Sequence, residues 1–146
     1  MSGSFAKVLT KNDTGETGGH QAGIAVPKAN TELLSFFPFL NPREFNPDSW
    51  LYCTDIDGQE WEMRYIYYNG KAFDPPKSTR NEYRITHMTK FFTKWRAKTG
   101  DAVVFSKTSR ENHFQISIKP ESGSRENMDK TEDNNVIVLR GWSRVY

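Results

Sequence analysis

Short β-rich runs separated by turn-forming residues limit the folds that this chain can adopt. The runs are rich in β-branched and aromatic residues, and they do not alternate with helices as parallel α/β folds require. They lie at 4–10, 22–28, 49–56, 60–69, 83–86, 102–107, 113–119 and 136–142. We therefore expect a mainly β fold, an open antiparallel β-barrel of about seven strands with two short helices.

Two segments carry helix signals, and one dipeptide carries a hairpin signal. The segment 30–38 begins with Asn30, has an apolar face and ends at a proline. The segment 88–100 has an aromatic stripe and ends at Gly100, which we expect to follow the helix C-cap. Asp57 and Gly58 lie between two β-rich runs and predict a hairpin turn there.

Four large side chains, Trp61, Met63, Tyr65 and Tyr67, recur at a spacing of two in the run 60–69. Alternate residues of a strand share one face, so this spacing favours a barrel core. Exposed on a barrel surface, the three aromatic rings would instead form a stacking surface for single-stranded nucleic acid. A single-stranded nucleic-acid binder is therefore one alternative to the functions considered below.

The composition indicates a single folded domain over residues 1–146. Of the 146 residues, 36% are apolar and 26% are charged, and no stretch is long and apolar enough to span a bilayer. Cys53 is the one cysteine, which excludes an internal disulfide and a cysteine-rich zinc site. The N-terminus lacks the regions of a signal peptide, so we expect a cytoplasmic protein with no membrane partner. The polar segment 121–135 is expected to be a mobile loop.

The sequence offers no convincing catalytic centre. The segment Asp55–Glu60 lacks the third carboxylate and the correctly spaced terminal Glu of a calcium loop, and the three histidines form no HxH or HxxxH pair. Asp48 and Glu62 are the acids that a metal-dependent nuclease would need, but no acid-x-Lys follows them. We therefore expect no catalytic residue, metal or cofactor in this chain. A small metal-dependent nuclease is the second alternative.

Positive charge gathers in one segment although the chain carries a net charge of only +2. The segment Lys77–Lys98 holds seven Lys and Arg residues against the single acidic residue Glu82, a local charge of +6. Such a cluster is either a solvated face or a surface for a polyanion such as nucleic acid.

The first candidate binding segment is polar and rich in glycine. Its side chains donate or accept hydrogen bonds, and its glycines let the backbone approach a ligand closely. It is either an exposed connection or a loop that DNA orders. The segment consists of Lys11, Asn12, Asp13, Thr14, Gly15, Glu16, Thr17, Gly18, Gly19, His20 and Gln21.

The second candidate segment has the alternation of an extended strand. Arg80, Glu82 and Arg84 then share one face, and Asn81 and Tyr83 share the other. Arginine pairs with guanine, and a carboxylate accepts from the cytosine amino group. The alternative is a surface salt bridge worth less than about 1 kcal/mol. The set of DNA-binding candidates here is Lys71, Lys77, Ser78, Thr79, Arg80, Asn81, Glu82, Tyr83, Arg84, Lys90 and Lys94.

Four blocks between about Lys11 and Thr86 resemble the N-terminal effector domain of the EcoRII restriction endonuclease family: NDTGETGGHQAGIAVP, FFPFLNPREFNP, IYYNGKAF and STRNEYRIT. The later stretch FFTKWRAKTGDAVVFSK resembles the wider group of DNA-binding pseudobarrels that includes the plant B-three-type domains. The residues Arg80, Asn81, Glu82 and Arg84 match the family motif TRNExR. Tyr83 stands where a basic residue is expected, and an extra Ser or Thr precedes the motif.

The resemblance implies a seven-stranded pseudobarrel with two short helices that binds double-stranded DNA. An N-arm (Lys11–Gln21) and a C-arm (Lys77–Arg84) would grip the major groove. The implied target is a short pseudopalindrome, CC(A/T)GG or a close relative of it. The implied domain is a monomer in isolation and does not cut DNA. A separate nuclease domain, fused to it in a type II restriction endonuclease, would supply cleavage and use Mg²⁺.

Overall fold

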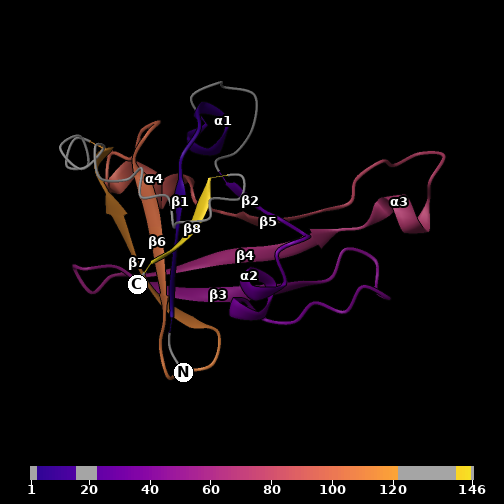
Figure 1. Cartoon of the computed structure of the whole chain (residues 1–146), viewed down its shortest axis with the longest axis horizontal. Coiled ribbons are helices and arrows are strands. Elements are labelled where there is room, and N and C mark those ends of the chain that lie inside the picture. Colours follow the sequence, from indigo (N-terminus) through magenta and orange to yellow (C-terminus); the bar gives the residue numbers. More distant parts are fainter. Residues whose placement is uncertain (1–2, 16–22, 122–140, 146) are drawn as a thin grey trace.

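One curled sheet with short helices makes up the part of the chain that the computed structural model describes, residues 3–15, 23–121 and 141–145 (Figure 1). In space the strands follow the order β2-β5-β4-β3-β7-β6-β1-β8. All neighbours are antiparallel except β3 and β7. The prediction of a mainly β, open antiparallel barrel is therefore confirmed, although the described residues form eight strands where about seven were expected. The strands are β1 (Ser4–Val8), β2 (Ile24–Val26), β3 (Asp48–Thr54), β4 (Glu60–Tyr68), β5 (Glu82–Thr86), β6 (Ala102–Lys107), β7 (His113–Lys119) and β8 (Trp142–Val145).

Four short helices occur in the described residues, where the sequence predicted two. They are α1 (Lys11–Thr14), α2 (Thr31–Phe36), α3 (Gly70–Phe73) and α4 (Thr89–Lys94). The helix α2 starts as expected at Asn30, whose side chain accepts a hydrogen bond from the Leu33 backbone at 3.0 Å.

The end of α4 differs from the sequence-based expectation. Trp95 caps the helix through its backbone N–H, so the prediction that Gly100 follows the C-cap is wrong. Arg96 adopts a left-handed φ of 52° and turns the chain away earlier. Gly100, with a φ of 98°, lies in the turn before β6, and its N–H donates to the Leu9 carbonyl at 2.9 Å.

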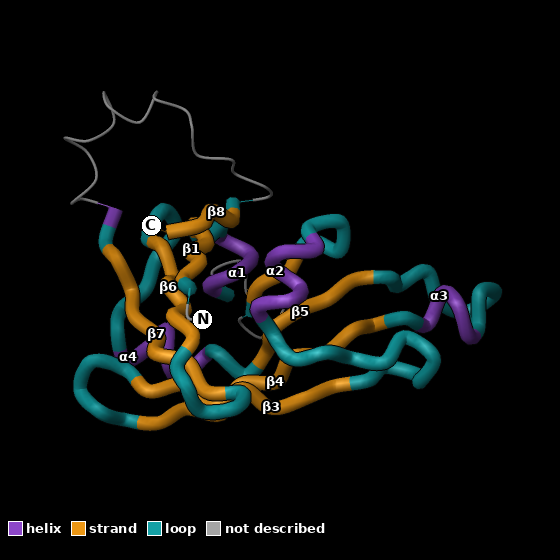
Figure 2. The backbone as a smooth tube through the Cα atoms, turned by 60° about the horizontal axis from the view of Figure 1, so that its bottom comes forward, coloured by secondary structure: helices purple, strands orange, loops and turns teal. Residues whose placement is uncertain are grey.

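The two edges of the sheet meet through a side chain rather than through a strand ladder. The strands β2 and β8 are the edge strands, and the indole N–H of Trp142 in β8 donates to the Ala25 carbonyl in β2 at 2.8 Å. Trp142 is itself almost fully buried. The sheet therefore curls far enough to enclose a core without closing into a continuous barrel (Figure 2).

The core is centred on Phe37, which follows α2 and points into the barrel. It is 3% exposed, and five aromatic ring centroids lie 5.1–6.1 Å from its own. These rings come from α2 and from four different strands, so Phe37 joins elements that are distant in the sequence. The five are Phe36, Tyr65, Phe105, Phe114 and Trp142.

The aromatic run of β4 also belongs to this core. Met63, Tyr65 and Tyr67 are buried, and Trp61 is half-buried against it. The prediction that these four residues line the barrel is confirmed. Because these rings face inward, they do not provide a stacking surface for single-stranded nucleic acid.

Some of the remaining sequence-based predictions concern residues that the structure describes, and others lie outside them. Asp57 and Gly58 lie in the β3–β4 hairpin turn as predicted, with a φ of 85° at Gly58. The segment 121–135 lies outside the described residues apart from Glu121, and so does most of the predicted strand 136–142. No helix in the described ranges is both long and apolar enough to cross a membrane.

Replacing Phe37 by Ala should destabilise the fold by about 3–5 kcal/mol, because a central ring with five aromatic neighbours is lost and a cavity remains. Phe39, two residues along and 83% exposed, is the matched control. Its replacement by Ala should change the unfolding free energy by less than about 0.5 kcal/mol. Urea unfolding of both variants is the measurement, and equal effects would contradict the central place of Phe37.

Candidate nucleic-acid interface

A strip of charged side chains runs along one face of the C-arm. We call Arg80, Glu82 and Arg84 the charged strip. A guanidinium nitrogen of Arg80 lies 2.9 Å from one carboxylate oxygen of Glu82, and one of Arg84 lies 3.7 Å from the other. The side chains of Arg80 and Glu82 are 49% and 40% exposed. The charged strip therefore presents a positive, a negative and a positive group in a row along the C-arm.

The intervening residues face the barrel. The ring of Tyr83 stacks on that of Tyr67 with a centroid distance of 4.2 Å and an interplanar angle of 1°. The side-chain oxygen of Asn81 accepts from the Tyr67 hydroxyl at 2.6 Å and from the Lys28 ammonium at 3.0 Å. The predicted alternation of the C-arm is thus confirmed. Asn81 joins the C-arm to the turn after β2, because its oxygen is held there.

Tyr83 occupies the position where the motif suggested a basic residue. Burial raises the pKa of its hydroxyl, and the neighbouring Tyr67 raises it further. The phenol therefore stays neutral at physiological pH. The positive charge of the C-arm comes from other residues.

A buried amide holds the loop that leads from β4 into the C-arm, and we call residues 70–79 of this loop the tip. The Asn69 side chain donates to the carbonyls of Pro42 and Glu44 at 3.2 and 2.7 Å and accepts from the Asn46 backbone at 2.8 Å. The α2–β3 connection is thereby fixed against the β4–α3 junction. An added Cβ at Gly70 would overlap the side chain of Ser78, so the two sides of the tip pack closely.

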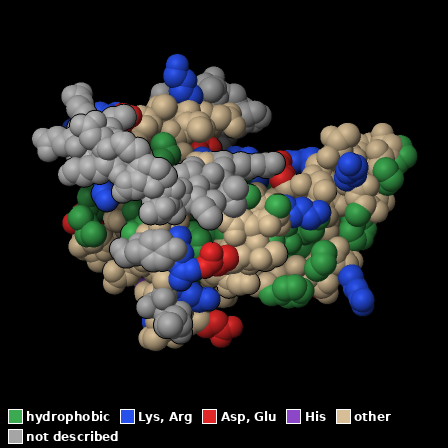
Figure 3. Space-filling view, viewed as in Figure 1, with side chains coloured by type: hydrophobic (Ala, Val, Ile, Leu, Met, Phe, Trp, Pro, Cys, Tyr) green, Lys and Arg blue, Asp and Glu red, His purple; other side chains and the backbone are tan. Residues whose placement is uncertain are grey.

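Four further candidates lie at this tip. Lys71, Lys77 and Thr79 are exposed, and Ser78 is half-buried. The Lys71 backbone donates to the Arg80 carbonyl at 3.0 Å, and the Ser78 hydroxyl accepts from the Arg80 backbone at 3.3 Å. Lys and Arg side chains are visible among apolar ones over this region (Figure 3). The tip therefore places basic side chains beside the charged strip.

The N-arm begins with a helical turn that the sequence analysis did not predict. The Thr10 hydroxyl accepts from the Asp13 backbone at 3.2 Å, and the Asp13 carboxylate accepts from the Thr10 backbone at 3.0 Å. This is a capping box, and Gly15 ends the turn with a left-handed φ of 83°. The signal was present in the sequence as a Thr followed three residues later by Asp.

A buried ion pair anchors this turn to the barrel. The Lys7 ammonium lies 2.6 Å from the Asp13 carboxylate, and both side chains are less than one tenth exposed. Asp13 is therefore held by the fold, whereas Lys11 and Asn12 are exposed and Thr14 and Gly15 are half-buried. The other N-arm candidates, Glu16, Thr17, Gly18, Gly19, His20 and Gln21, lie outside the described residues.

The strand that follows the N-arm pairs with the strand that contains the end of the C-arm. The Gly23 N–H donates to the Asp13 carbonyl at 3.0 Å. This hydrogen bond holds together the two ends of the segment that joins Asp13 to Gly23. The strand β2 follows at once and pairs with β5, Ile24 opposite Ile85. An added Cβ at Gly23 would lie 2.6 Å from the Ile85 carbonyl, so only glycine allows this approach. The strand β5 thus runs between α1 and the C-arm tip (Figure 1).

Two candidates lie elsewhere. Lys90 and Lys94 belong to α4, at the opposite end of the molecule from α3 in both views (Figures 1 and 2). Lys90 is exposed. The Lys94 ammonium lies 2.8 Å from a carboxylate oxygen of Asp55 and 3.2 Å from one of Asp57. The structure therefore does not bring these two lysines together with the charged strip.

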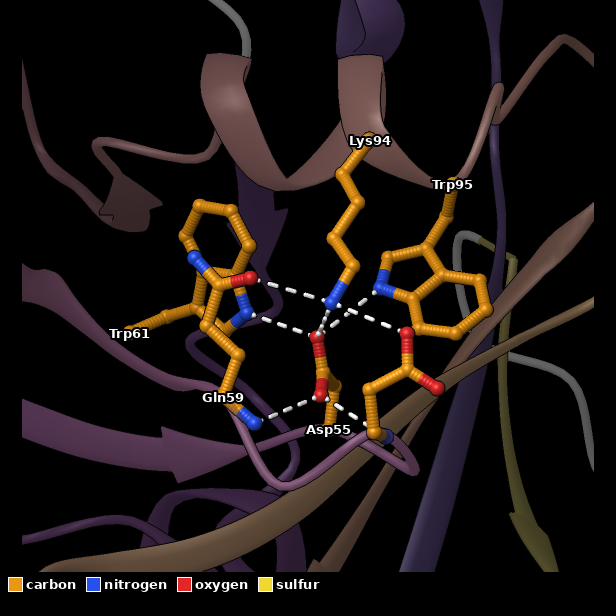
Figure 4. Close-up of polar contacts among 6 residues, drawn as sticks. Asp55, Gln59, Trp61, Lys94 and Trp95 are labelled. Atoms are coloured by element: carbon orange, nitrogen blue, oxygen red, sulfur yellow. Dashed lines mark hydrogen bonds and ion pairs between the residues drawn. The ribbon is translucent and has the colours of Figure 1, made fainter.

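The Asp55 carboxylate is the centre of a polar cluster under α4 (Figure 4). Besides Lys94, it accepts from the indole N–H groups of Trp61 and Trp95 at 3.0 and 3.1 Å. It also accepts from the Gln59 backbone at 2.9 Å. Burial alone would raise the pKa of Asp55, but these hydrogen bonds outweigh burial and hold the pKa well below its usual range. The cluster fastens α4 to the β3–β4 hairpin.

The acids considered for a nuclease site do not converge. Asp48 lies 2.7 Å from the guanidinium of Arg64 and is paired with it. Asp48 stands opposite Ile66, whereas Glu62 stands four positions along β4, a separation of roughly 13 Å. Within the ranges that the structure covers, no group of three or more His, Cys, Asp or Glu is placed to hold a metal ion.

The chain is similar to a type II restriction enzyme and to plant auxin response factors. The family described as "Restriction endonuclease EcoRII, N-terminal" matches residues 2–125. The type II restriction enzyme EcoRII of Escherichia coli is 45% identical over 85 residues, which cover 56% of this chain and 20% of the enzyme. Auxin response factor 17 of Arabidopsis thaliana is 33% identical over 111 residues, 76% of this chain and 17% of that protein. The chain thus spans one fifth or less of these curated relatives.

A solved structure shows the same fold. The structure titled "Arabidopsis FUS3-DNA complex" matches with a TM-score of 0.58 and 18% identity, over 79% of this chain and 94% of that chain. The likeness supports the pseudobarrel assignment that the sheet order already indicates.

Replacing Asp55 by Ala should destabilise the fold by about 2–4 kcal/mol, because two indole N–H groups lose their acceptor in a buried place. Asp57→Ala removes the more exposed carboxylate beside Lys94 and is the matched control with little expected effect. Thermal unfolding distinguishes them. Similar melting temperatures for Asp55→Ala and wild type would refute the structural role of this cluster.

The cluster also predicts how stability depends on pH. The folded-state pKa of Asp55 lies below its ordinary value of 3.8, so its contribution is complete above that value and is lost as the pH falls further. Wild type should therefore lose unfolding free energy below about pH 4 more steeply than Asp55→Ala. Urea unfolding across pH 3–6 measures both slopes, and parallel curves would exclude Asp55 as the titrating group.

Proposed function

Because this chain belongs to the family of EcoRII restriction endonuclease N-terminal domains, we propose that it binds double-stranded DNA and reads a short base sequence in the major groove. The observation that carries the proposal is the charged strip. Glu82 and Arg84 project from one face of β5, which the Tyr67–Tyr83 stack fixes from behind, and Arg80 joins them from just before the strand through its ion pair with Glu82. Such a rigid, alternating set of donors and acceptors suits base edges better than phosphates alone.

Glu82 is the feature that distinguishes base reading from simple attraction to phosphate. A carboxylate in a basic arm repels the phosphate backbone, so a surface built only for charge would not contain it. In the free domain the two neighbouring arginines compensate its charge. In the proposed complex the carboxylate accepts from a cytosine amino group while an arginine pairs with a guanine. A C·G-containing site of this kind agrees with CC(A/T)GG or a close relative.

The position of the arms supports a major-groove complex. The β2–β5 ladder connects the two arms, because β2 follows the N-arm and β5 contains the end of the C-arm. A duplex placed along β5 would contact the charged strip on one side and Lys11 and Asn12 on the other, with Lys71 and Lys77 near its phosphates. The solved FUS3–DNA complex is a DNA complex of a protein with this fold, which supports the proposal by analogy.

We propose that cleavage belongs to a separate part of a longer protein. The chain spans 20% of the EcoRII enzyme, and within the described residues Asp48 is paired with Arg64, apart from Glu62. We therefore place a Mg²⁺-dependent nuclease activity in a separate domain of a type II restriction endonuclease. A standalone nuclease has less support, since its candidate acids lie far apart.

The domain should bind a duplex containing CC(A/T)GG at least about a thousandfold more tightly than a scrambled duplex at physiological salt. Its affinity should fall steeply with salt because Lys and Arg contacts release counterions from phosphate. Fluorescence anisotropy on both duplexes over a salt series is the measurement. Equal affinity for the two duplexes would overturn the proposal.

Glu82→Ala should lower discrimination at one base pair by roughly 1–3 kcal/mol, because a base-specific acceptor is lost. Binding to random duplex should rise slightly, since the arm becomes more basic. Glu62→Ala makes the same change of charge at an exposed position of β4 and should leave base preference unaltered. A competition assay against every single-base variant of the site separates these outcomes. Wild-type preference at all positions in Glu82→Ala would exclude Glu82 as a base reader.

A further inference from the structure

The guanidinium of Arg80 rests on the ring of Tyr68, and this contact is separate from the ion pair with Glu82. The guanidinium carbon lies 3.6 Å from the ring centroid of Tyr68. Tyr68 is the last residue of β4 and stands directly opposite Glu82 in the β4–β5 ladder. Directly opposite residues of an antiparallel pair point to the same face. Tyr68, Arg80 and Glu82 therefore form one compact group on the exposed side of the sheet.

Arg80 is the member of the charged strip that most needs such support. It lies two residues before β5 begins, so no strand ladder orders it. Its backbone is held instead by the tip, through the Lys71 N–H and the Ser78 hydroxyl. Its side chain is 49% exposed and, left alone, would sample many rotamers.

The stack and the ion pair restrict different motions of this side chain. The aromatic ring covers one face of the planar guanidinium and fixes its plane. Glu82 holds one nitrogen on the edge at 2.9 Å and fixes rotation within that plane. Stacking uses the face of the guanidinium and not its N–H edge, so the hydrogen-bond donors keep their capacity to meet a base.

We propose that Tyr68 is a positioning residue that sets the direction of Arg80 for base reading, an inference that rests on the proposed function. Tyr68 need not contact the base. Its contribution is to order the guanidinium before DNA arrives, which lowers the entropy lost on binding. This lower entropic cost favours binding only where Arg80 meets the base that it recognises. Tyr68 therefore affects specificity more than general affinity for DNA.

The test compares Tyr68→Leu, which removes the π face, with Tyr68→Phe, which keeps it. Affinities are measured against the cognate duplex, every single-base variant and a scrambled duplex. Tyr68→Leu should lose roughly three- to tenfold in cognate affinity, with the loss concentrated at one base pair. Tyr68→Phe should retain the wild-type preference. Tyr52→Leu, at a half-exposed tyrosine of β3, is the matched control without expected effect.

A double-mutant cycle separates positioning from a general structural role. Tyr68→Leu should cause no further loss in an Arg80→Ala background, because the side chain that it positions is absent. An equal loss in both backgrounds, or an equal loss on cognate and scrambled duplex, would overturn the inference.

Arg80→Lys keeps the inference testable if Tyr68→Leu fails to fold. This change leaves the sheet untouched and keeps the charge but removes the planar group that stacks. It should lose preference at the same base pair while its salt dependence stays that of wild type. If Arg80→Lys, or a folded Tyr68→Leu, keeps the wild-type base preference, the role of Tyr68 is refuted while the proposed function still stands. A wild-type domain without any base preference would instead refute the proposed function itself.

Discussion

The pairing of β5 with β4 is the constraint on which the rest of the molecule depends. Its register places Tyr83 opposite Tyr67 on the inner face and Glu82 opposite Tyr68 on the outer face. A shift of one residue would exchange the two faces, so the charged strip would enter the core and the tyrosine would leave it. The Tyr67–Tyr83 stack and the Asn81 hydrogen bonds oppose that shift. One ladder therefore fixes both the barrel wall and the surface that we propose reads DNA.

Strong local patterns made much of the fold predictable from the sequence. The strands β6 and β7 begin and end where their alternation indicated, and Asn30 begins α2 because its side chain is a good N-cap. The turn α1 was not predicted, although its capping box is visible in the sequence, because the glycine-rich segment that follows is typical of a loop. The end of α4 was missed for another reason. No sequence signal shows that Arg96 takes a left-handed conformation.

The candidate site was predictable only as far as strand periodicity reaches. Alternation in the C-arm separated the charged strip from Asn81 and Tyr83 correctly. It did not reveal that Asn81 is bound to Lys28, 53 residues earlier in the chain, or that Lys94 is bound to Asp55, 39 residues earlier. Lys94 is close to the arm in sequence, but its ammonium pairs with Asp55 instead. Contacts between distant segments decide which of the lysines remain available, and one sequence does not contain them.

The backbone hydrogen bond between Asp13 and Gly23 closes the segment between them into a loop. Both ends of the segment are fastened to the barrel, one by the buried Lys7–Asp13 pair and the other by the close approach of Gly23 to β5. The entropic cost of closing a loop grows slowly, by only about 0.6 kcal/mol for each doubling of the loop's length. Residues between these two points can therefore be added, removed or exchanged at little cost to the sheet. A scaffold arranged in this way lets selection change what the arm contacts while the fold stays constant.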